Sequence, residues 1–474
     1  MNPASHLHLP SRVHIIGICG VATSALAIAL SERKVAVTGS DKGFFPPVST
    51  ELSRRKIAFY AGWHPEKMIA YGLPEIVVAG GSGTSPSNPE VLFAKARGLP
   101  VLSFAEAIGS FVVKKNSIVT AGTWGKTTNS ALLSSILAAA GMKPSYFTGG
   151  VPLSHKSGVI ADSDWSVVEG DEYQAAIWDK KAKFFYYHPV YLLLSAVSWD
   201  HADLYPSEAE YFRAFLKLLE MIPANGFVTA CADNDGVGTA MRSWKGKAVW
   251  YGREGNKLAS YTYDRVKQTK DGLDFRLQHE SKAWEIHSPM LGLYQSENIA
   301  GCFALARELG IAAEKILTAI SRFKGIRRRL EKRHEGPVAI YDDIAHSPDK
   351  AGPVLQTLRS IYGGKVIAVF EPNIGGRQRQ TAHKYDHAFA SADIVVIPEL
   401  SKLKTAADQS EQPMNGAEVA VAIGKTHGAV HYIGDDSALV RFLVETAEPG
   451  DVIAFLGSRG WRGMIERTIA KISS

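Results

Sequence analysis

The feature that most constrains the fold is the stretch Val119–Leu137, VTAGTWGKTTNSALLSSIL, which reads as a strand, a glycine turn and a helix. The overlapping run NSIVTAG is short and β-branched, as buried parallel strands are. The residues after the turn have helical spacing, with Leu132, Leu133 and Ile136 on one face, and the pattern ends at Gly141. This order of elements directs backbone N–H groups and the positive end of a helix dipole at an anion.

The turn is similar to a phosphate-binding loop but departs from the usual pattern G-x-x-x-x-G-K-[ST]. Thr120 stands where the first glycine is expected, Gly122 comes late, and Trp124 lies inside the shortened loop. In such a loop Lys126 lies along the β- and γ-phosphates, and the Thr127 hydroxyl binds Mg²⁺. The alternative is an ordinary strand-to-helix loop that contains Gly-Lys-Thr-Thr by chance. The flanking strand and helix favour the phosphate site.

Length and composition restrict the class of protein. A chain of 474 residues exceeds one ordinary core, which predicts two to four domains. With 46% apolar and 21% charged residues the chain is enzyme-like, and it has no basic run interleaved with aromatic residues, so we expect no nucleic-acid partner. The net charge of +6 weakly favours an anionic small substrate.

The first residues and the cysteines indicate the cellular compartment of the protein. The start MNPASHLHLPSRVHIIGICG lacks the cationic start and long apolar core of a signal peptide, and no apolar run reaches membrane-spanning length. Cys19, Cys231 and Cys302 are scattered and lack metal-ligand spacing. We therefore expect a cytoplasmic protein with no membrane partner.

Strands alternate with helices along the whole chain, which predicts a mostly parallel α/β architecture in three units. Residues 1–112 form a Rossmann-like unit with a G-x-x-G turn at Gly17 and Gly20, and its second strand closes on Asp41. Residues 113–325 carry the phosphate loop, and residues 326–474 form a further α/β unit. A nicotinamide-dependent oxidoreductase would use the first unit, but that alternative leaves the phosphate loop unexplained.

Polar residues follow two buried strands of the middle unit, where α/β sheets place their ligands. The motifs VVEGDEY and SWDHADLY carry Glu169, Asp171 and Glu172, and Asp200, His201 and Asp203. Carboxylates beside the Thr127 hydroxyl suit Mg²⁺, although a histidine ligand is unusual for that ion. The alternative for His201 is a surface histidine capped by Asp200 or Asp203.

Charged residues also mark the third unit. Arg327, Arg328 and Arg329 stand at its start, and such a run is usually a solvated face. After a phosphate-loop domain, however, an arginine from a neighbouring domain can neutralise charge on a transferring phosphoryl group. The motif YDDIAHSP ends a strand with paired acids, which can be a ribose clamp, a second metal site or a turn.

Five motifs in this order give the chain a specific resemblance. AGTWGKTTN, VEGDEY, DHAD, GIRRRLE and YDDIAHSP resemble those of the Mur ligase family of peptidoglycan synthesis, and the similarity covers essentially the whole chain. The family's own phosphate loop is the short G-T-x-G-K-T-T form. The resemblance implies a Rossmann-like N-terminal domain for UDP-N-acetylmuramate, a phosphate-loop central domain for ATP and Mg²⁺, and a Rossmann-like C-terminal domain for a peptide.

Matching positions imply a role for each residue in these motifs. UDP-sugar binding falls to Gly17, Gly20, Ser40 and Asp41. ATP binding falls to Gly122, Thr123, Gly125, Lys126, Thr127, Thr128, Asn298, Arg329 and Asp343. The metal ligands are Thr127, Glu169 and His201, and the catalytic residues are Lys126, Glu169, His201 and Arg329. Peptide binding falls to His346, Ser458 and Arg459.

Within the family, the chain resembles the branch that joins UDP-N-acetylmuramate to the recycled tripeptide L-alanyl-γ-D-glutamyl-meso-diaminopimelate. The segments GSDKGFFPPVSTEL and DEYQAAIWDKKAKFFYYHP carry this likeness, and the L-alanine-adding branch is shorter between the Glu169 and His201 positions. The resemblance implies a monomer or weak homodimer, with hinges near residues 112 and 325.

Several residues depart from the family pattern. They are Trp124, Ala196, Tyr294, Gln295, Ser347, Arg459 and Arg462. These departures keep open a muropeptide-binding protein without catalysis, and the sister branch keeps open an L-alanine ligase. Either Arg459 or Arg462 can form a bidentate pair with a peptide carboxylate, or both are solvated surface residues.

Overall fold

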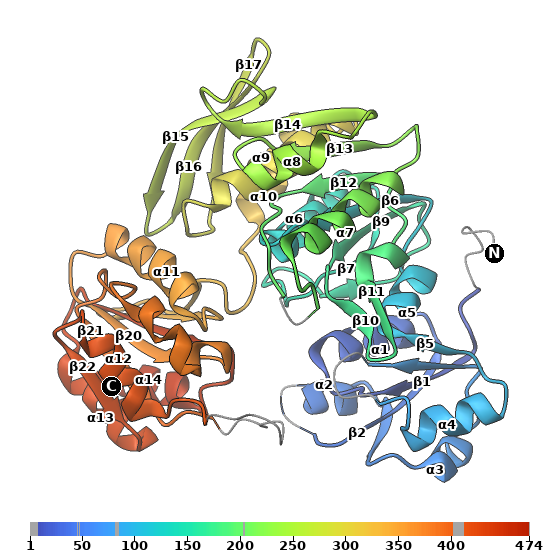
Figure 1. Ribbon diagram of the computed structural model, residues 1–474, viewed down its shortest axis with the longest axis horizontal. Coiled ribbons are helices and arrows are strands. Elements are labelled where there is room, and N and C mark those ends of the chain that lie inside the picture. The colour runs from blue at the N-terminus through green and yellow to red at the C-terminus, as the bar shows by residue number, and fades with distance from the viewer. Residues whose placement is uncertain are drawn as a thin grey trace. The chain divides into compact units, whose positions relative to one another are not determined.

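A computed structural model describes residues 8–44, 46, 48–80, 85–201, 204–401 and 412–473 (Figure 1). Asp203, one of the residues noted in the DHAD motif, lies outside the described residues. Within the described residues, parallel strands alternate with helices in three successive sheets, as the sequence predicts.

The first sheet has the strand order β3-β2-β1-β4-β5, and all its neighbouring strands are parallel. Its strands are β1 (Arg12–Ile16), β2 (Ala36–Asp41), β3 (Ala58–Ala61), β4 (Ile76–Ala79) and β5 (Val101–Ser103). Its helices are α1 (Val21–Glu32), α2 (Val48–Arg54), α3 (Pro65–Ala70), α4 (Pro89–Ala96) and α5 (Phe104–Phe111). This is the expected Rossmann-like unit, with the glycine turn between β1 and α1.

The second sheet has the order β17-β16-β15-β14-β13-β12-β6-β9-β7-β8. Its strands are β6 (Asn116–Ala121), β7 (Ser145–Phe147), β8 (Gly158–Val159), β9 (Trp165–Gly170), β12 (Tyr191–Leu194), β13 (Phe227–Cys231), β14 (Lys247–Arg253), β15 (Tyr261–Thr269), β16 (Gly272–His279) and β17 (Lys282–Ser288). Its helices are α6 (Lys126–Ala139), α7 (Glu208–Glu220), α8 (Asp235–Met241), α9 (Gln295–Glu308) and α10 (Ala313–Arg322). Strand β6 pairs with β9 on one side and β12 on the other, both in parallel.

The third sheet has the order β18-β19-β23-β20-β21-β22, parallel except for β18 against β19. Its strands are β18 (Glu331–His334), β19 (Ala339–Asp343), β20 (Val366–Glu371), β21 (Ile394–Pro398), β22 (Val430–Ile433) and β23 (Val452–Gly457). Its helices are α11 (Pro348–Ile361), α12 (Gly416–Gly424), α13 (Asp436–Thr446) and α14 (Met464–Ile472), with short 3₁₀ turns η2 (Gly375–Arg377) and η3 (Arg379–Tyr385). Separate apolar clusters cover its two faces, as expected for a sheet between helical layers.

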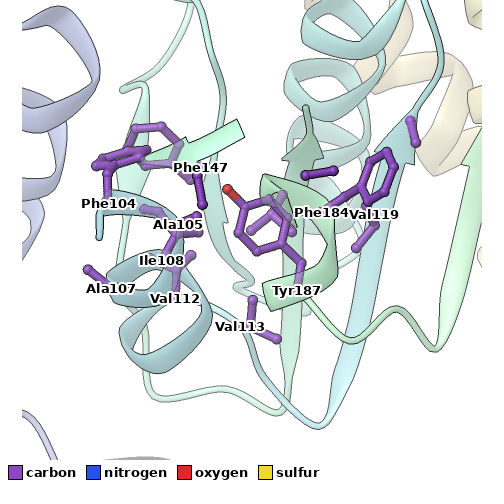
Figure 2. Packing of buried hydrophobic residues seen from close by; sticks show 14 of the residues in the cluster. Phe104, Ala105, Ala107, Ile108, Val112, Val113, Val119, Phe147, Phe184 and Tyr187 are labelled. Atoms are coloured by element: carbon purple, nitrogen blue, oxygen red, sulfur yellow. The ribbon is translucent and has the colours of Figure 1, made fainter. Parts of the chain in front are cut away.

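The first two sheets share one hydrophobic core. Helix α5 contributes Phe104 and Ile108 to a cluster that also contains Phe147, Phe184 and Tyr187 of the following segments (Figure 2). The rings of Phe104 and Phe147 meet edge to face with centroids 5.3 Å apart. These contacts argue against the hinge that the sequence predicts near residue 112.

The chain divides instead into two compact units. One holds residues 1–265, 275–287 and 296–324, and the other holds residues 266–274, 288–295 and 325–474. One division therefore lies between Lys324 and Gly325, next to the second expected boundary. Among the described residues, no helix combines the length and apolar character needed to cross a membrane.

Candidate active site

The phosphate loop lies between β6 and α6 and depends on two glycines. Gly122 has φ +136° and Gly125 has φ +85°, values that favour glycine. A Cβ on Gly122 would lie 2.5 Å from Ser195 Oγ and 2.7 Å from Ala196 N, and one on Gly125 would lie 2.6 Å from Asn298 Oδ1. The loop is therefore packed closely against the segment after β12 and against α9.

The residue that replaces the usual first glycine belongs to the strand. Thr120 is fully buried in β6, and its hydroxyl donates to Lys126 O at 2.9 Å. This bond closes the short loop onto the first turn of α6. The departure from the longer pattern therefore has a structural reason, because the turn starts two residues later, at Gly122.

The segment after β12 supports the phosphate loop through hydrogen bonds. Thr123 N donates to Ala196 O at 2.9 Å, and the Thr123 hydroxyl donates to Ser198 O at 2.9 Å. The Ser195 hydroxyl donates to Trp124 O. Ala196, one of the departures from the family pattern, is buried and uses its backbone here, whereas the Trp124 side chain is 51% exposed.

Lys126 is held by a carboxylate that the sequence did not assign to it. Its Nζ donates to Gly122 O at 2.6 Å and lies 2.8 Å from Glu172 Oε2. His201 Nε2 lies 3.6 Å from Glu172 Oε1, and this interaction with Glu172 raises the pKa of His201. Glu172 is buried, and its carboxylate is the shared partner of Lys126 and His201. The surface-histidine alternative accounts for the backbone only, where His201 N donates to Asp200 Oδ1.

Glu169 lies at the end of β9 and contacts the other side of the loop. Thr127 Oγ1 donates to Glu169 Oε1 at 3.1 Å, and Gly149 N donates to Glu169 Oε2 at 2.6 Å. A hydroxyl and a carboxylate side by side at a helix N-terminus fit Mg²⁺, which takes one or two carboxylates and completes its shell with waters and phosphates. Among the described residues, no group of three or more His, Cys, Asp and Glu side chains is arranged to hold a metal.

His201 fits the metal less well than Thr127 and Glu169 do. A histidine that binds a metal must be neutral, and the ion pair with Glu172 favours the protonated ring. The expected role of His201 as a metal ligand therefore requires the imidazole to leave Glu172. Thr128 and Asn298 are both buried next to this site.

The glycine turn of the first sheet is held by the end of β2. Gly17 has φ +79°, and its N–H donates to Ser40 O at 2.8 Å. Asp41 accepts from Cys19 N at 2.8 Å, which ties the turn to the strand. Helix α1 begins after Gly20, which has no side chain to cap the helix. A helix N-terminus after a glycine turn suits a diphosphate, and this role of the turn stays a prediction.

The side chain of Ser40, one of the residues expected at the UDP-sugar site, contacts a buried carboxylate. It is fully buried, and its hydroxyl donates to Glu90 Oε2 at 2.5 Å. Glu90 also accepts from Tyr60 OH and His64 N, and it lies 3.5 Å from His14 Nε2. No sequence motif predicts this buried network. Its only sequence signal is the helix start Asn88-Pro89, which places Glu90 in the first turn of α4.

The end of β19 carries two aspartates with different partners. Asp343 accepts from Leu330 N at 2.6 Å and Ala345 N at 2.7 Å, and burial raises its pKa to about 6. Asp342 pairs with Arg328 at 3.2 Å. Both carboxylates are buried, and the ribose clamp, the second metal site and the turn stay open as predictions for this motif.

The predicted peptide-binding residues lie at neighbouring strand ends of the third sheet, because β23 pairs with both β19 and β20. His346 Nδ1 lies 2.7 Å from Ile344 O, and burial lowers the pKa of His346. Arg459 is exposed. Arg462 instead forms a bidentate pair with Asp436 at 2.8 and 2.7 Å, so it is not free for a peptide carboxylate.

Three family domains match the chain in order. Residues 12–115 match the description "Mur ligase family, catalytic domain", residues 119–306 match "Mur ligase middle domain", and residues 328–459 match "Mur ligase, glutamate ligase domain". Together with the three sheets, these matches confirm the expected three-domain α/β architecture.

Curated relatives of two kinds are equally similar. The UDP-N-acetylmuramate–L-alanyl-γ-D-glutamyl-meso-2,6-diaminoheptandioate ligase of Escherichia coli (strain K12) is 31% identical over 469 residues, 97% of each chain. The UDP-N-acetylmuramate–L-alanine ligase of Kineococcus radiotolerans is 31% identical over 450 residues, 94% of this chain and 93% of the relative. Their names differ in the amine acceptor.

Solved structures share the fold. A UDP-N-acetylmuramate-alanine ligase from Thermotoga maritima has a TM-score of 0.78 at 22% identity, and a murein peptide ligase from Psychrobacter arcticus has 0.70 at 22% identity. Both alignments cover 98% of this chain and 99% of the other. By its domains and by relatives that match along nearly its whole length, the chain belongs to the Mur ligase family, whose members are ATP-dependent ligases that form an amide bond.

Proposed function

We propose that this enzyme joins UDP-N-acetylmuramate to the tripeptide L-alanyl-γ-D-glutamyl-meso-diaminopimelate in peptidoglycan recycling. The observation that carries the proposal is the segment between Glu169 and His201. It forms an antiparallel hairpin of β10 (Gln174–Ala176) and β11 (Asp179–Ala182), followed by the 3₁₀ turn η1 (Lys183–Tyr186). This is the segment that resembles the tripeptide branch and that is shorter in the L-alanine branch.

Each domain would then bind one substrate. Residues 1–112 would bind UDP-N-acetylmuramate at the turn held by Asp41, with Ser40 acting through its backbone. Residues 113–325 would bind ATP, and residues 326–474 would bind the peptide. Asn298 would contact adenine, Asp343 the ribose and Arg329 the γ-phosphate. We expect the reaction in the cytoplasm, where ATP and UDP-sugars are made.

The first step is an attack of one anion on another. An oxygen of the lactyl carboxylate attacks the γ-phosphorus of ATP, the bond to the bridging oxygen breaks, and ADP leaves with the electron pair. The product is an acyl phosphate. Lys126 would turn from Glu172 and Gly122 O to the phosphates, since both partners hold its ammonium at the loop before ATP arrives.

The second step forms the amide. The uncharged α-amine of the acceptor attacks the acyl carbon, loses a proton, and inorganic phosphate leaves the tetrahedral intermediate. Thr127 and Glu169 would hold Mg²⁺, which when bound supplies charge neutralisation to the triphosphate. The ion pair of His201 with Glu172 would stay next to the loop, with the imidazolium of His201 as the cation and the Glu172 carboxylate as its partner.

The second candidate is the L-alanine ligase, and a specific observation favours it. A relative of that name is as similar as the tripeptide ligase, at 31% identity. The two candidates share the fold, the phosphate loop and the chemistry. They differ only in what the third domain accepts.

A competition experiment tests the proposal. The reaction contains the enzyme, ATP, Mg²⁺ and UDP-N-acetylmuramate, with the tripeptide and L-alanine at equal concentrations. The products are identified and quantified by mass spectrometry. We expect the UDP-N-acetylmuramoyl-tripeptide as the main product. A mixture dominated by UDP-N-acetylmuramoyl-L-alanine would favour the second candidate, and absence of both products with no ATP consumed would favour a binding protein without catalysis.

A further inference from the structure

Arg328 makes an unusual set of contacts for a member of an arginine run. Its guanidinium donates to three consecutive backbone carbonyls after β23, those of Gly457, Ser458 at 3.1 Å and Arg459 at 2.9 Å. Its Nε donates to Asp342 Oδ1 at 3.2 Å. One side chain therefore uses nearly its whole fork of donors on a single loop and the carboxylate behind it.

The backbone of Arg328 holds a second loop. Its carbonyl accepts from Ile344 N at 2.8 Å, at the start of the segment that leads to His346. The residue has φ +58°, and Leu330 has φ +45°, both rare for residues with a side chain. Such conformations persist where the surroundings fix them, and they are concentrated at functional sites.

Asp342 and Trp461 complete the attachment of the loop. Asp342 is 3% exposed and accepts from Trp461 Nε1 at 3.3 Å as well as from Arg328. The indole is buried against Phe455, with ring centroids 5.2 Å apart. Residues 457–461 are therefore fixed at one end by a guanidinium and at the other by a ring that share one carboxylate.

We propose that Arg328 is a positioning residue for the amine acceptor. It fixes the two loops, residues 344–346 and 457–461, that would bind the acceptor, and this inference rests on the proposed function of those loops. Arg462 is paired with Asp436, and Arg459 contributes its carbonyl to Arg328, so the shape of the loop depends on Arg328. Loss of this support should weaken acceptor binding and spare the step that uses ATP and UDP-N-acetylmuramate.

The test is steady-state kinetics of Arg328→Lys, with Arg328→Ala beside it. Lysine keeps the charge but has one ammonium, which cannot span three carbonyls and Asp342. Without these hydrogen bonds the acceptor must order the loop when it binds, and this cost is subtracted from its affinity. One hydrogen bond to a charged group corresponds to about tenfold in an equilibrium constant, so we expect KM for the acceptor to rise by about tenfold or more. KM for ATP, KM for UDP-N-acetylmuramate and kcat at saturating acceptor should change by less than about threefold.

Arg333→Lys is the matched control. Arg333 Nη1 lies 3.4 Å from Asp342 Oδ2, and the guanidinium also pairs with Glu331 and Glu466, but it contacts none of residues 457–461. This variant should leave all three KM values unchanged. An unchanged acceptor KM in Arg328→Lys, or an equal rise in the KM of all three substrates, would overturn the inference. If Arg328→Ala fails to fold, Arg328→Lys alone decides.

Failure of this inference is distinguishable from failure of the proposed function. The acceptor used by the wild-type enzyme is established first, and KM is measured for that acceptor. If L-alanine is the better acceptor, the proposed function is wrong, and Arg328 is still tested with L-alanine. If the tripeptide is the acceptor and Arg328→Lys binds it normally, only the role of Arg328 is wrong.

Discussion

At the scale of single residues, Lys126 carries the phosphate-loop assignment. We predict that Lys126→Ala reduces phosphate release by about 100-fold or more, because removal of one preorganised charge-stabilising group from an active site costs on the order of 3 kcal/mol. Binding of UDP-N-acetylmuramate should stay within a few-fold of wild type, since the proposed sugar-nucleotide site lies at a different sheet. Phosphate release and calorimetric binding of the sugar nucleotide measure the two effects.

Lys247→Ala is the control for that variant. Lys247 pairs with Glu308 at 2.6 Å on the surface, and its side chain is 55% exposed. Exposed pairs contribute little to stability, so activity should stay at the wild-type level. Turnover by Lys126→Ala within a few-fold of wild type would remove the lysine from the mechanism.

Glu297 predicts a pH dependence of stability. Burial raises its pKa to about 7 from an ordinary 4.5, with a further contribution from Asp233. As pH rises from about 4.5 to about 7, the carboxyl in the unfolded chain loses its proton first, so stability falls in this window and is constant above it. Glu297→Gln removes the titration. We expect the variant to match wild type near pH 5 and to exceed it at pH 8 by on the order of 3 kcal/mol.

Urea unfolding at the two pH values measures this difference. Glu280→Gln, at a side chain that is 80% exposed, is the control and should show no difference from wild type that grows with pH. If Glu297→Gln and wild type lose stability in parallel between pH 5 and pH 8, Glu297 is not the titrating group.

Residue types at the site could be predicted from the sequence, whereas most of their partners could not. The phosphate-loop lysine and threonine follow from a local pattern. The pair of Lys126 with Glu172 joins residues 46 positions apart, and Arg462 finds Asp436 26 positions away. Ser40 turns inward because Glu90, on another element, accepts its hydroxyl. Such pairings depend on the packing of elements that a linear pattern does not encode.

At the scale of elements, the glycine turn between β6 and α6 is the decisive one. We predict that Gly122→Ala lowers ATP affinity by at least about tenfold, because the residue needs a conformation that only glycine adopts easily and its Cβ would meet Ser195 and Ala196. Titration calorimetry with a non-hydrolysable ATP analogue measures the loss.

Gly98→Ala is the matched control for this turn. Gly98 also has positive φ, at +69°, but a Cβ there would meet nothing within 4 Å. It should therefore lose about 1–2 kcal/mol of stability through its backbone alone and bind ATP normally. Normal ATP affinity in Gly122→Ala would show that the tight packing of the turn is not required.

Strands that are buried apolar runs can be predicted from the sequence, whereas strands that are short or that alternate with charged residues cannot. Strands β1, β6, β9, β19 and β23 follow from buried apolar runs. Strands β15, β16 and β17 are not among the predicted strands, and their inward residues alternate with charged ones, as in VKQTKDGLDFRLQ. The short strands β3, β18 and β22 are not predicted either. Their lengths of four residues leave little pattern, and their pairing is set by the sheet they join.

At the scale of the whole molecule, movement should take place at residue 325 and not at residue 112. Helix α5 is buried in the core that the first two sheets share, and Arg33 pairs with Asp162 and Lys156 with Glu32 between them. We predict that a non-hydrolysable ATP analogue with UDP-N-acetylmuramate changes amide hydrogen exchange at residues 322–330. Exchange at residues 104–121 should stay slow with and without ligands.

Hydrogen exchange at residues 104–121 can also contradict this prediction. Fast exchange at residues 104–121 in the free enzyme that slows on ligand binding would restore the hinge near residue 112. It would also mean that the shared core opens, which the burial of Phe111 and Val112 opposes.

The acceptor is the central claim, and kcat/KM for phosphate release tests it most directly. It is measured with UDP-N-acetylmuramate, ATP and Mg²⁺ against the tripeptide and against L-alanine. The tripeptide carries carboxylates and a distal amine that alanine lacks, and a site that pairs such groups discriminates by about 10⁴ or more. We predict a kcat/KM for the tripeptide that exceeds that for L-alanine by about this factor. A higher kcat/KM for L-alanine would contradict the account and assign the enzyme to the L-alanine branch.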